Sequence, residues 1–171
     1  MKKQLFALFL TLCLAFAALA FSVQADTAKV LTVAKSGGDY QSVEQALQAV
    51  EDMAKNGELG EKGVCLVLSG SHTATSKNGI LFGQKTIFFP DGKKVPVTVT
   101  GGTLNFPEGS VACTNDYRFT DITIPFDDRE TLLFAGSGNI TLENVTYFGK
   151  KLTAETAPIY LAGPVAPPVI R

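Results

Sequence analysis

Short strand-like strings that return at regular intervals constrain the fold of this sequence more than any other feature. Asp121–Ile124 returns as Asn144–Tyr147, and Leu132–Gly136 returns as Ile159–Gly163. Each string combines β-branched or apolar residues with an Asp, Asn or Gly that favours a turn. The strings return after 23 and 27 residues, respectively. Intervals of this length predict a β-solenoid, whose coils stack because no single coil can bury its apolar face alone.

Strands are predicted along most of the chain. Val64–Ser69 is apolar at almost every position, which predicts a strand covered on both faces, as in a parallel sheet. A turn, with the option of a local hairpin, is predicted at Pro90-Asp91-Gly92. Other predicted strands are KVLTV at 29–33, GILF, KTIFF, KKVPVTVTGG, GTLNF, YRFTDITI, TLLFAG, NITLENVTYFG and PIYLAG.

One amphipathic helix is predicted after the first strand. Ser42 and Gln45 form a capping box, in which Ser42 accepts from the backbone of Gln45 and the Gln45 side chain reaches back. Asn56-Gly57 ends the helix. Its apolar stripe consists of Val43, Ala46, Leu47, Val50 and Ala54, and the residues expected to face water are Glu44, Gln48, Glu51 and Lys55.

These patterns predict an all-β fold: a short right-handed parallel β-helix with one N-terminal capping α-helix. A β-sandwich is the alternative, because its strands also alternate with turns. A sandwich, however, gives no reason for strings to return in register or for one capped helix at the start.

The segment 1–25 has the layout of a secretory signal peptide. Lys2 and Lys3 precede an apolar run from Leu5 to Phe21, and small side chains lead to the predicted cleavage site before Asp26. The alternative is an uncleaved membrane anchor. We therefore expect a secreted or cell-surface protein whose mature domain spans residues 26–171.

The charge of the mature chain argues against a polyanionic partner. Loss of the signal segment removes two lysines and no acid, which changes the formal net charge from -1 to -3. No run of Lys or Arg alternates with aromatic residues, so nucleic acid is not an expected partner. We also expect no membrane contact after signal removal.

Two cysteines, Cys65 and Cys113, remain in the mature chain. Export to an oxidising compartment would allow a disulfide between them, and the alternative is two small buried hydrophobic residues. The lone His72 and the two cysteines lack the spacing of metal ligands. His72 also lacks a nucleophile at a suitable spacing, so we expect a surface or packed histidine rather than a catalytic base.

The opening segments carry a family resemblance. Residues 31–50 followed by 63–76 resemble the start of pectin-lyase-like right-handed parallel β-helices, and pectinesterases show the resemblance most plainly. In that family a strand leads through a Gly-Asp-Tyr turn, here Gly38, Asp39 and Tyr40, into a helix that caps the solenoid. The segments around 132–149 and 159–163 also resemble repeats of bacterial surface β-helix proteins. The resemblance implies a fold and not an activity.

Catalytic motifs of such enzymes are not recognisable in this chain. The nearest candidate is FDDRE, in which Asp127, Asp128 and Glu130 could bind calcium and Arg129 could face a substrate acid. The alternative interpretation is a solvated loop, and no cofactor is expected. Candidates for an aromatic carbohydrate groove are Phe88, Phe89, Phe106 and Phe148 and, as better candidates, Tyr40, Tyr117, Tyr147 and Tyr160.

The sequence thus predicts an exported, non-catalytic β-helix module that binds glycans or proteins. The alternative is the N-terminal fragment of a carbohydrate-active enzyme, of the pectinesterase or polysaccharide lyase class, whose catalytic coils are missing. The apolar, Pro-rich end at residues 159–171 contains no predicted cap. We therefore expect either an incomplete domain or self-association through an open C-terminal coil.

Overall fold

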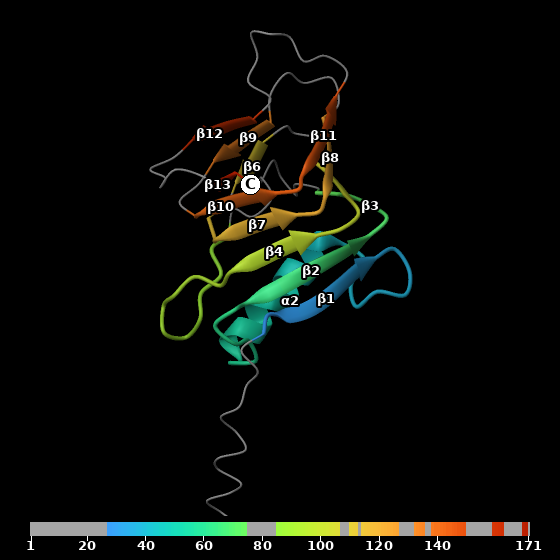
Figure 1. The fold of residues 1–171 in the computed structure, drawn as a ribbon. Helices are drawn as coiled ribbons and strands as arrows, with labels where there is room; N and C mark the ends of the chain where they lie inside the picture. The colour runs from blue at the N-terminus through green and yellow to red at the C-terminus, as the bar shows by residue number, and fades with distance from the viewer. Residues whose placement is uncertain are drawn as a thin grey trace, which may run out of the picture.

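Parallel β-sheets and one helix make up the described part of the chain. The computed structural model describes residues 27–74, 85–106, 110–112, 114–126, 132–135, 138–149, 159–162 and 169–170. Within these ranges thirteen strands pair in parallel and form three sheets (Figure 1). This content confirms the predicted all-β class. Antiparallel sheets build a β-sandwich, so the parallel pairings do not fit that alternative.

The strands are distributed over a large sheet and two smaller ones. Sheet A contains, in spatial order, β1 (Lys29–Ala34), β2 (Val64–Ser69), β4 (Val97–Thr100), β7 (Tyr117–Thr120), β10 (Ile140–Glu143) and β13 (Val169–Ile170). Sheet B contains β11 (Thr146–Gly149), β8 (Thr123–Phe126), β5 (Thr103–Asn105) and β3 (Ser71–Thr73). Sheet C contains β12 (Ile159–Ala162), β9 (Leu132–Ala135) and β6 (Ser110–Ala112).

The chain visits the three sheets in a constant order. It passes through β4, β5 and β6, then β7, β8 and β9, then β10, β11 and β12, each time from sheet A to B to C. Equivalent strands of successive rounds are neighbours: Thr123 pairs with Thr146, and Leu132 pairs with Ile159. Both repeats predicted from the sequence are therefore confirmed as strands in register.

A residue in the left-handed backbone conformation separates sheet A from sheet B in four successive rounds. These residues are Gly70 (φ 81°), Gly101 (φ 73°), Asp121 (φ 49°) and Asn144 (φ 52°). Only Gly, Asn and Asp adopt this conformation readily, so the residue type at each corner is explained. The segments YRFTDITI and NITLENVTYFG, predicted as single strands, are consequently each divided into two strands at Asp121 and Asn144.

Helix α2 (Val43–Lys55) begins and ends where the sequence predicts. The hydroxyl of Ser42 accepts a hydrogen bond from the backbone N–H of Gln45, at 3.2 Å, and Asn56 is the C-cap. One half of the capping box is wrong, because the Gln45 side chain accepts from the backbone of Gln41 instead of Ser42, at 3.1 Å. Glu51, predicted to face water, is buried.

One interior holds the buried side chains of the helix and of sheets A and B. Helix α2 lies against β1 and β2 (Figure 1), and its buried apolar residues pack in the same core as inward side chains of the strands, such as Leu66 and Phe119. In β2 only alternate residues are buried, while Cys65 and Val67 are half-buried on the outer face. The parallel pairing predicted for this strand is confirmed, whereas burial is complete on one face only.

Candidate functional site

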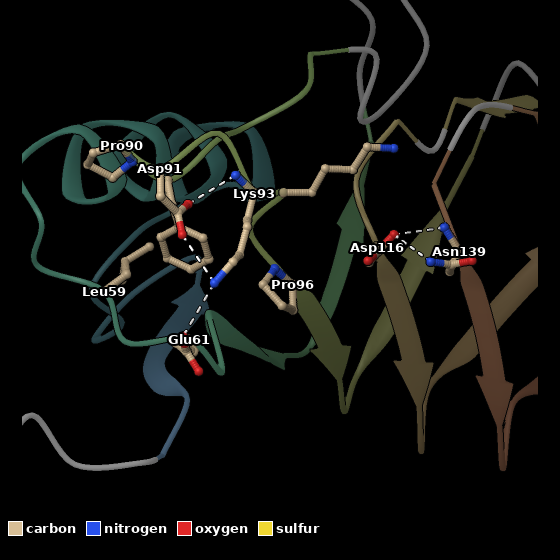
Figure 2. A pocket seen from close by; sticks show the side chains of 10 residues that line it. Leu59, Glu61, Pro90, Asp91, Lys93, Pro96, Asp116 and Asn139 are labelled. Atoms are coloured by element: carbon tan, nitrogen blue, oxygen red, sulfur yellow. Dashed lines mark hydrogen bonds and ion pairs between the residues drawn. The ribbon is translucent and has the colours of Figure 1, made fainter.

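A cleft of about 760 Å³ opens where the strands of sheet A begin. Its walls come from the loop after α2, from the segment between residues 89 and 96, and from the turns that precede β7 and β10 (Figure 2). Its volume falls in the range of about 300–1,000 Å³ that is typical of ligand sites.

The segment 87–95 folds back on itself as a tight hairpin turn. Phe89 donates to the carbonyl of Lys93 at 2.8 Å, and Val95 donates to the carbonyl of Ile87 at 2.9 Å. This confirms the predicted turn at residues 90–92. KTIFF, predicted as a strand, contributes only an isolated antiparallel bridge between Phe88 and Lys94. The strand predicted from residue 93 begins only at Val97, because the preceding Pro96 has no N–H to donate.

A buried amide holds the start of this hairpin. Asn115 is fully buried, and its side-chain oxygen accepts from the backbone N–H of Ile87 at 2.7 Å. Its side-chain nitrogen donates to the backbone carbonyl of Lys85 at 3.2 Å. Buried polar groups of this kind are costly unless bonded, so the two bonds define the position of residues 85–87.

A buried carboxylate joins the same segment to helix α2. Glu51 is 8% exposed and forms ion pairs with Lys55, at 2.7 Å, and Lys85, at 2.5 Å. Hydrogen bonding to Lys55 and then to Lys85 lowers the pKa of Glu51. The hairpin that borders the cleft is thus attached to the helix and, through Asn115, to the turn before β7.

Two exposed acids flank Lys93 at the mouth of the cleft. Its ammonium lies 3.2 Å from the carboxylate of Asp91 and 3.5 Å from that of Glu61 (Figure 2). Asp91 also accepts from the backbone N–H of Lys93 at 3.0 Å. Hydrogen bonding to that backbone group, and then to the Lys93 side chain, lowers the pKa of Asp91, and the acids raise the pKa of Lys93. Both pKa values move away from neutral pH, which is the opposite of what a general acid or base needs.

An Asp–Asn pair forms the far wall of the cleft. One carboxylate oxygen of Asp116 accepts from the backbone N–H of Asn139, at 2.9 Å, and from its side-chain nitrogen, at 3.0 Å. The two residues precede β7 and β10, so they occupy the same position in successive rounds (Figure 2). This arrangement presents fixed hydrogen-bonding groups rather than a reactive one.

The predicted calcium site and one of the two cysteines lie outside the described part of the chain. Asp127, Asp128, Arg129 and Glu130 lie outside the described residues, as does Cys113, so the calcium and disulfide hypotheses stay predictions. In the described part of the chain no group of three or more His, Cys, Asp or Glu is arranged to hold a metal ion.

Two further candidates, Cys65 and His72, lie in strands. Cys65 is half-buried in β2, where burial raises the pKa of its thiol. His72 is buried in β3, and its Nε2 atom lies 3.0 Å from the carbonyl oxygen of Ser69. Of the two states predicted for His72, surface or packed, the structure shows the packed one.

The aromatic residue in the cleft lining is a phenylalanine. Phe89 is half-buried and lines the cleft, and Phe88 beside it is 49% exposed. Tyr117, one of the preferred tyrosine candidates, is buried in the core and stacked on Phe119 at 5.9 Å, so it does not line this cleft.

The other aromatic candidates whose side chains are described do not line the cleft. Phe106 is buried, and Tyr40 and Tyr147 are half-buried against the core. Burial raises the pKa of Tyr147 to about 12, and among the described residues its hydroxyl is the one buried side-chain polar atom without a hydrogen-bond partner. The side chains of Phe148 and Tyr160 lie outside the described part of the structure.

No sequence motif indicated that Asp116 and Asn139 would border a cleft. Asp116 and Asn139 are separated by the same interval that separates Asp121 from Asn144. Extending the repeat towards the N-terminus with the same offset would have paired them. By contrast, the positions of Glu61 and Lys93 depend on how two loops meet, and no sequence interval indicates this.

Comparison with known proteins assigns no family to the chain. No protein-family model, curated protein or solved structure matches it. Across the described ranges, no helix has both the length and the apolar character needed to span a membrane. Function is therefore inferred from the geometry of the chain itself.

Proposed function

We propose that this chain is an exported right-handed parallel β-helix module that binds a glycan or a protein without transforming it. The repeated passage from sheet A to B to C supports the fold, because equivalent strands of successive rounds pair in parallel. Crossover connections between parallel strands are almost always right-handed. The signal-like segment at residues 1–25 supports export.

The interior supports stacked coils closed at one end by a helix. Inward positions of consecutive strands, such as Val99, Phe119 and Leu142, are in register and buried. At the β1 end, Val43, Ala46 and Val50 of α2 are buried in the same core. A solenoid needs such a cover, because its last coil would otherwise expose an apolar face.

The observation that carries the binding function is that charged and polar groups of the cleft are paired with one another. Lys93 lies between two carboxylates, and Asp116 is bonded to Asn139. A catalytic carboxylic acid requires a raised pKa, whereas that of Asp91 is lowered. The lowered pKa of Asp91 and the bonded Asp116 support ligand recognition rather than proton transfer.

A combined binding and turnover experiment tests this proposal. The mature chain from Asp26 is incubated with neutral and acidic polysaccharides and with surface proteins, and binding is measured by calorimetry. Release of reducing ends, unsaturated products or methanol is followed in parallel. We expect binding without release. Product formation above that of a heat-denatured control would contradict the proposal, as would the absence of binding to every glycan and protein.

A further inference from the structure

We propose that the cleft at the start of sheet A binds a neutral glycan, with a sugar ring on Phe89 and sugar hydroxyls on Asp116 and Asn139. The inference rests on the proposed binding function and adds the site and the class of ligand. Four observations support it: the apolar lining, the geometry of the Asp–Asn pair, the net charge of the cleft, and the hydrogen bonds already made by the backbone beside the cleft.

Apolar rings supply one side of the cleft. Phe89 lines it together with Leu59, Pro90 and Pro96. Phe88, one of two large hydrophobic residues that are exposed in the described part of the chain, adjoins this lining in sequence. Sugar rings carry C–H groups on their faces and pack on flat apolar rings of this kind, as aromatic side chains do on other apolar surfaces. The ring of Phe89 in the cleft lining therefore offers a surface for the apolar face of a sugar.

The Asp–Asn pair supplies fixed hydrogen-bond acceptors on the other side. Asn139 donates twice to one oxygen of Asp116, at 2.9 and 3.0 Å. The pair itself does not use the second carboxylate oxygen of Asp116 or the amide oxygen of Asn139. Both atoms are acceptors for hydroxyl donors. The two side chains already hold each other in place. Binding of a sugar therefore costs little further conformational entropy in these side chains.

The charge of the lining selects a neutral ligand. The cleft contains three acids, Glu61, Asp91 and Asp116, and two lysines, Lys93 and Lys94. Two of the acids are already within 3.5 Å of Lys93, so that lysine does not present an unopposed positive charge. A uronate, sulfate or phosphate ligand would meet a surface of net negative charge, which disfavours its approach.

The backbone beside the cleft disfavours a peptide. The carbonyls of Pro96, Asp116 and Asn139 accept from Val64, Val97 and Tyr117 at 3.0, 2.9 and 2.9 Å. A peptide that binds by adding a strand needs unpaired backbone groups along a sheet edge. The cleft instead presents side chains, which suits a ligand that carries many hydroxyl groups.

An array of neutral and acidic oligosaccharides, followed by nuclear magnetic resonance titration, tests this inference. The ¹⁵N-labelled mature chain is titrated with the neutral oligosaccharide that the array identifies and with trigalacturonic acid. We expect the neutral sugar to shift the amide signals of residue 89, residues 91–95, and residues 116 and 139, and the acidic sugar to leave them unchanged. The wild-type titration requires no variant that might fail to fold.

Variants then assign the contacts. Asp116→Ala is expected to weaken binding of the neutral sugar about tenfold, because it removes a hydrogen bond to a charged acceptor. Phe89→Ala is expected to weaken it as well. The matched control is Asp52→Ala, which removes an exposed acid of α2 outside the cleft lining and should leave the dissociation constant unchanged. Circular dichroism verifies that each variant is folded.

The outcomes separate this inference from the proposed function. Sugar-induced shifts on the outer face of sheet A, at Thr98 and Arg118, would overturn the site while the binding function stands. Binding of acidic sugars alone, or of a protein partner alone, would overturn the ligand class. Failure to bind any oligosaccharide on the array overturns the inference, and failure to bind proteins as well overturns the proposed function.

Discussion

The carboxylate of Asp39 accepts hydrogen bonds from both the backbone N–H and the hydroxyl of Thr32, at 2.7 and 2.8 Å. The Thr32 hydroxyl accepts in turn from the backbone N–H of Asp39, at 3.0 Å. Thr32 lies in β1, the edge strand of sheet A, and Tyr40 donates to its carbonyl at 3.1 Å. The turn after β1 thus covers backbone groups that could otherwise pair with another chain. This structural role is sufficient to explain the Gly-Asp-Tyr turn without any enzymatic activity.

Asp39→Ala is expected to lower the melting temperature and to promote association. The change leaves the N–H of Thr32 unpaired at the sheet edge, where another strand can bind it. Thermal unfolding and sedimentation velocity measure the two effects. Asp52→Ala, which removes an exposed acid from α2, is the control and should change neither.

The same pair predicts a pH dependence. Hydrogen bonds from the backbone and side chain of Thr32 lower the pKa of Asp39 below its ordinary value of 3.8. The ionised carboxylate of Asp39 therefore stabilises the folded state fully above pH 3.8. This stabilisation is lost as the pH falls through the lowered pKa of Asp39. The difference in melting temperature between wild type and Asp39→Asn should shrink in that range. A difference that stays constant down to the lowest pH would contradict this assignment.

Val50→Asp is expected to unfold the domain. Val50 is fully buried in the helix face that packs into the core, and an unpaired buried charge costs more than about 3 kcal/mol. Leu47→Asp is the matched control, because Leu47 is only half-buried and its cost should be about 1 kcal/mol. Urea unfolding followed by circular dichroism measures both. Equal effects of the two changes would show that α2 does not cover the core through this face.

Gly63→Ala is expected to destabilise the protein much more than Gly57→Ala. Both glycines have a positive φ, at 66° and 71°, so both changes carry the left-handed penalty of about 1 kcal/mol. A Cβ atom at Gly63 would lie 2.1 Å from the carbonyl oxygen of Pro96, whereas one at Gly57 would meet nothing within 4 Å. Chemical denaturation should show a loss above about 3 kcal/mol for Gly63→Ala alone. Similar losses for both variants would contradict the close approach at Gly63.

Asn144 offers a test of the corner between sheets A and B. Asn144→Gly and Asn144→Ala both remove the 3.1 Å hydrogen bond to Asp121, but only alanine is strained at a φ of 52°. Asn144→Ala should therefore be about 1 kcal/mol less stable than Asn144→Gly. Equal stabilities in urea unfolding would mean that the corner does not require the left-handed conformation.

Local signals in the sequence predicted the elements well. The Ser42 cap and the Asn56-Gly57 stop located α2 at its observed ends, because both act on backbone groups within one turn of the helix. The two repeat intervals predicted which strands pair, because stacked rounds place equivalent residues side by side. The division of predicted strands at Asp121 and Asn144 was missed, although both are residue types that tolerate a positive φ.

The candidate site was much less predictable. Glu51 lies on the polar side of the helical pattern, yet it is buried because Lys85, from a distant part of the chain, pairs with it. In the sequence Asn115 is typical of a turn, but its side-chain amide forms hydrogen bonds with the backbone of residues 85 and 87. Such roles depend on which distant segment comes to rest beside a residue, and local propensity contains no information about this.

By itself the sequence determined the helix and its caps, the alternation of strands and turns, and the pairing of successive rounds. Each of these follows from interactions within a few residues or from a repeated interval. Only the tertiary structure decided that Asp39 closes the edge of β1, that Glu51 is buried, and that Phe89, Asp116 and Asn139 border one cleft. The physical reason is that these contacts join separate segments, and their energies exist only after the strands have stacked and brought those segments together.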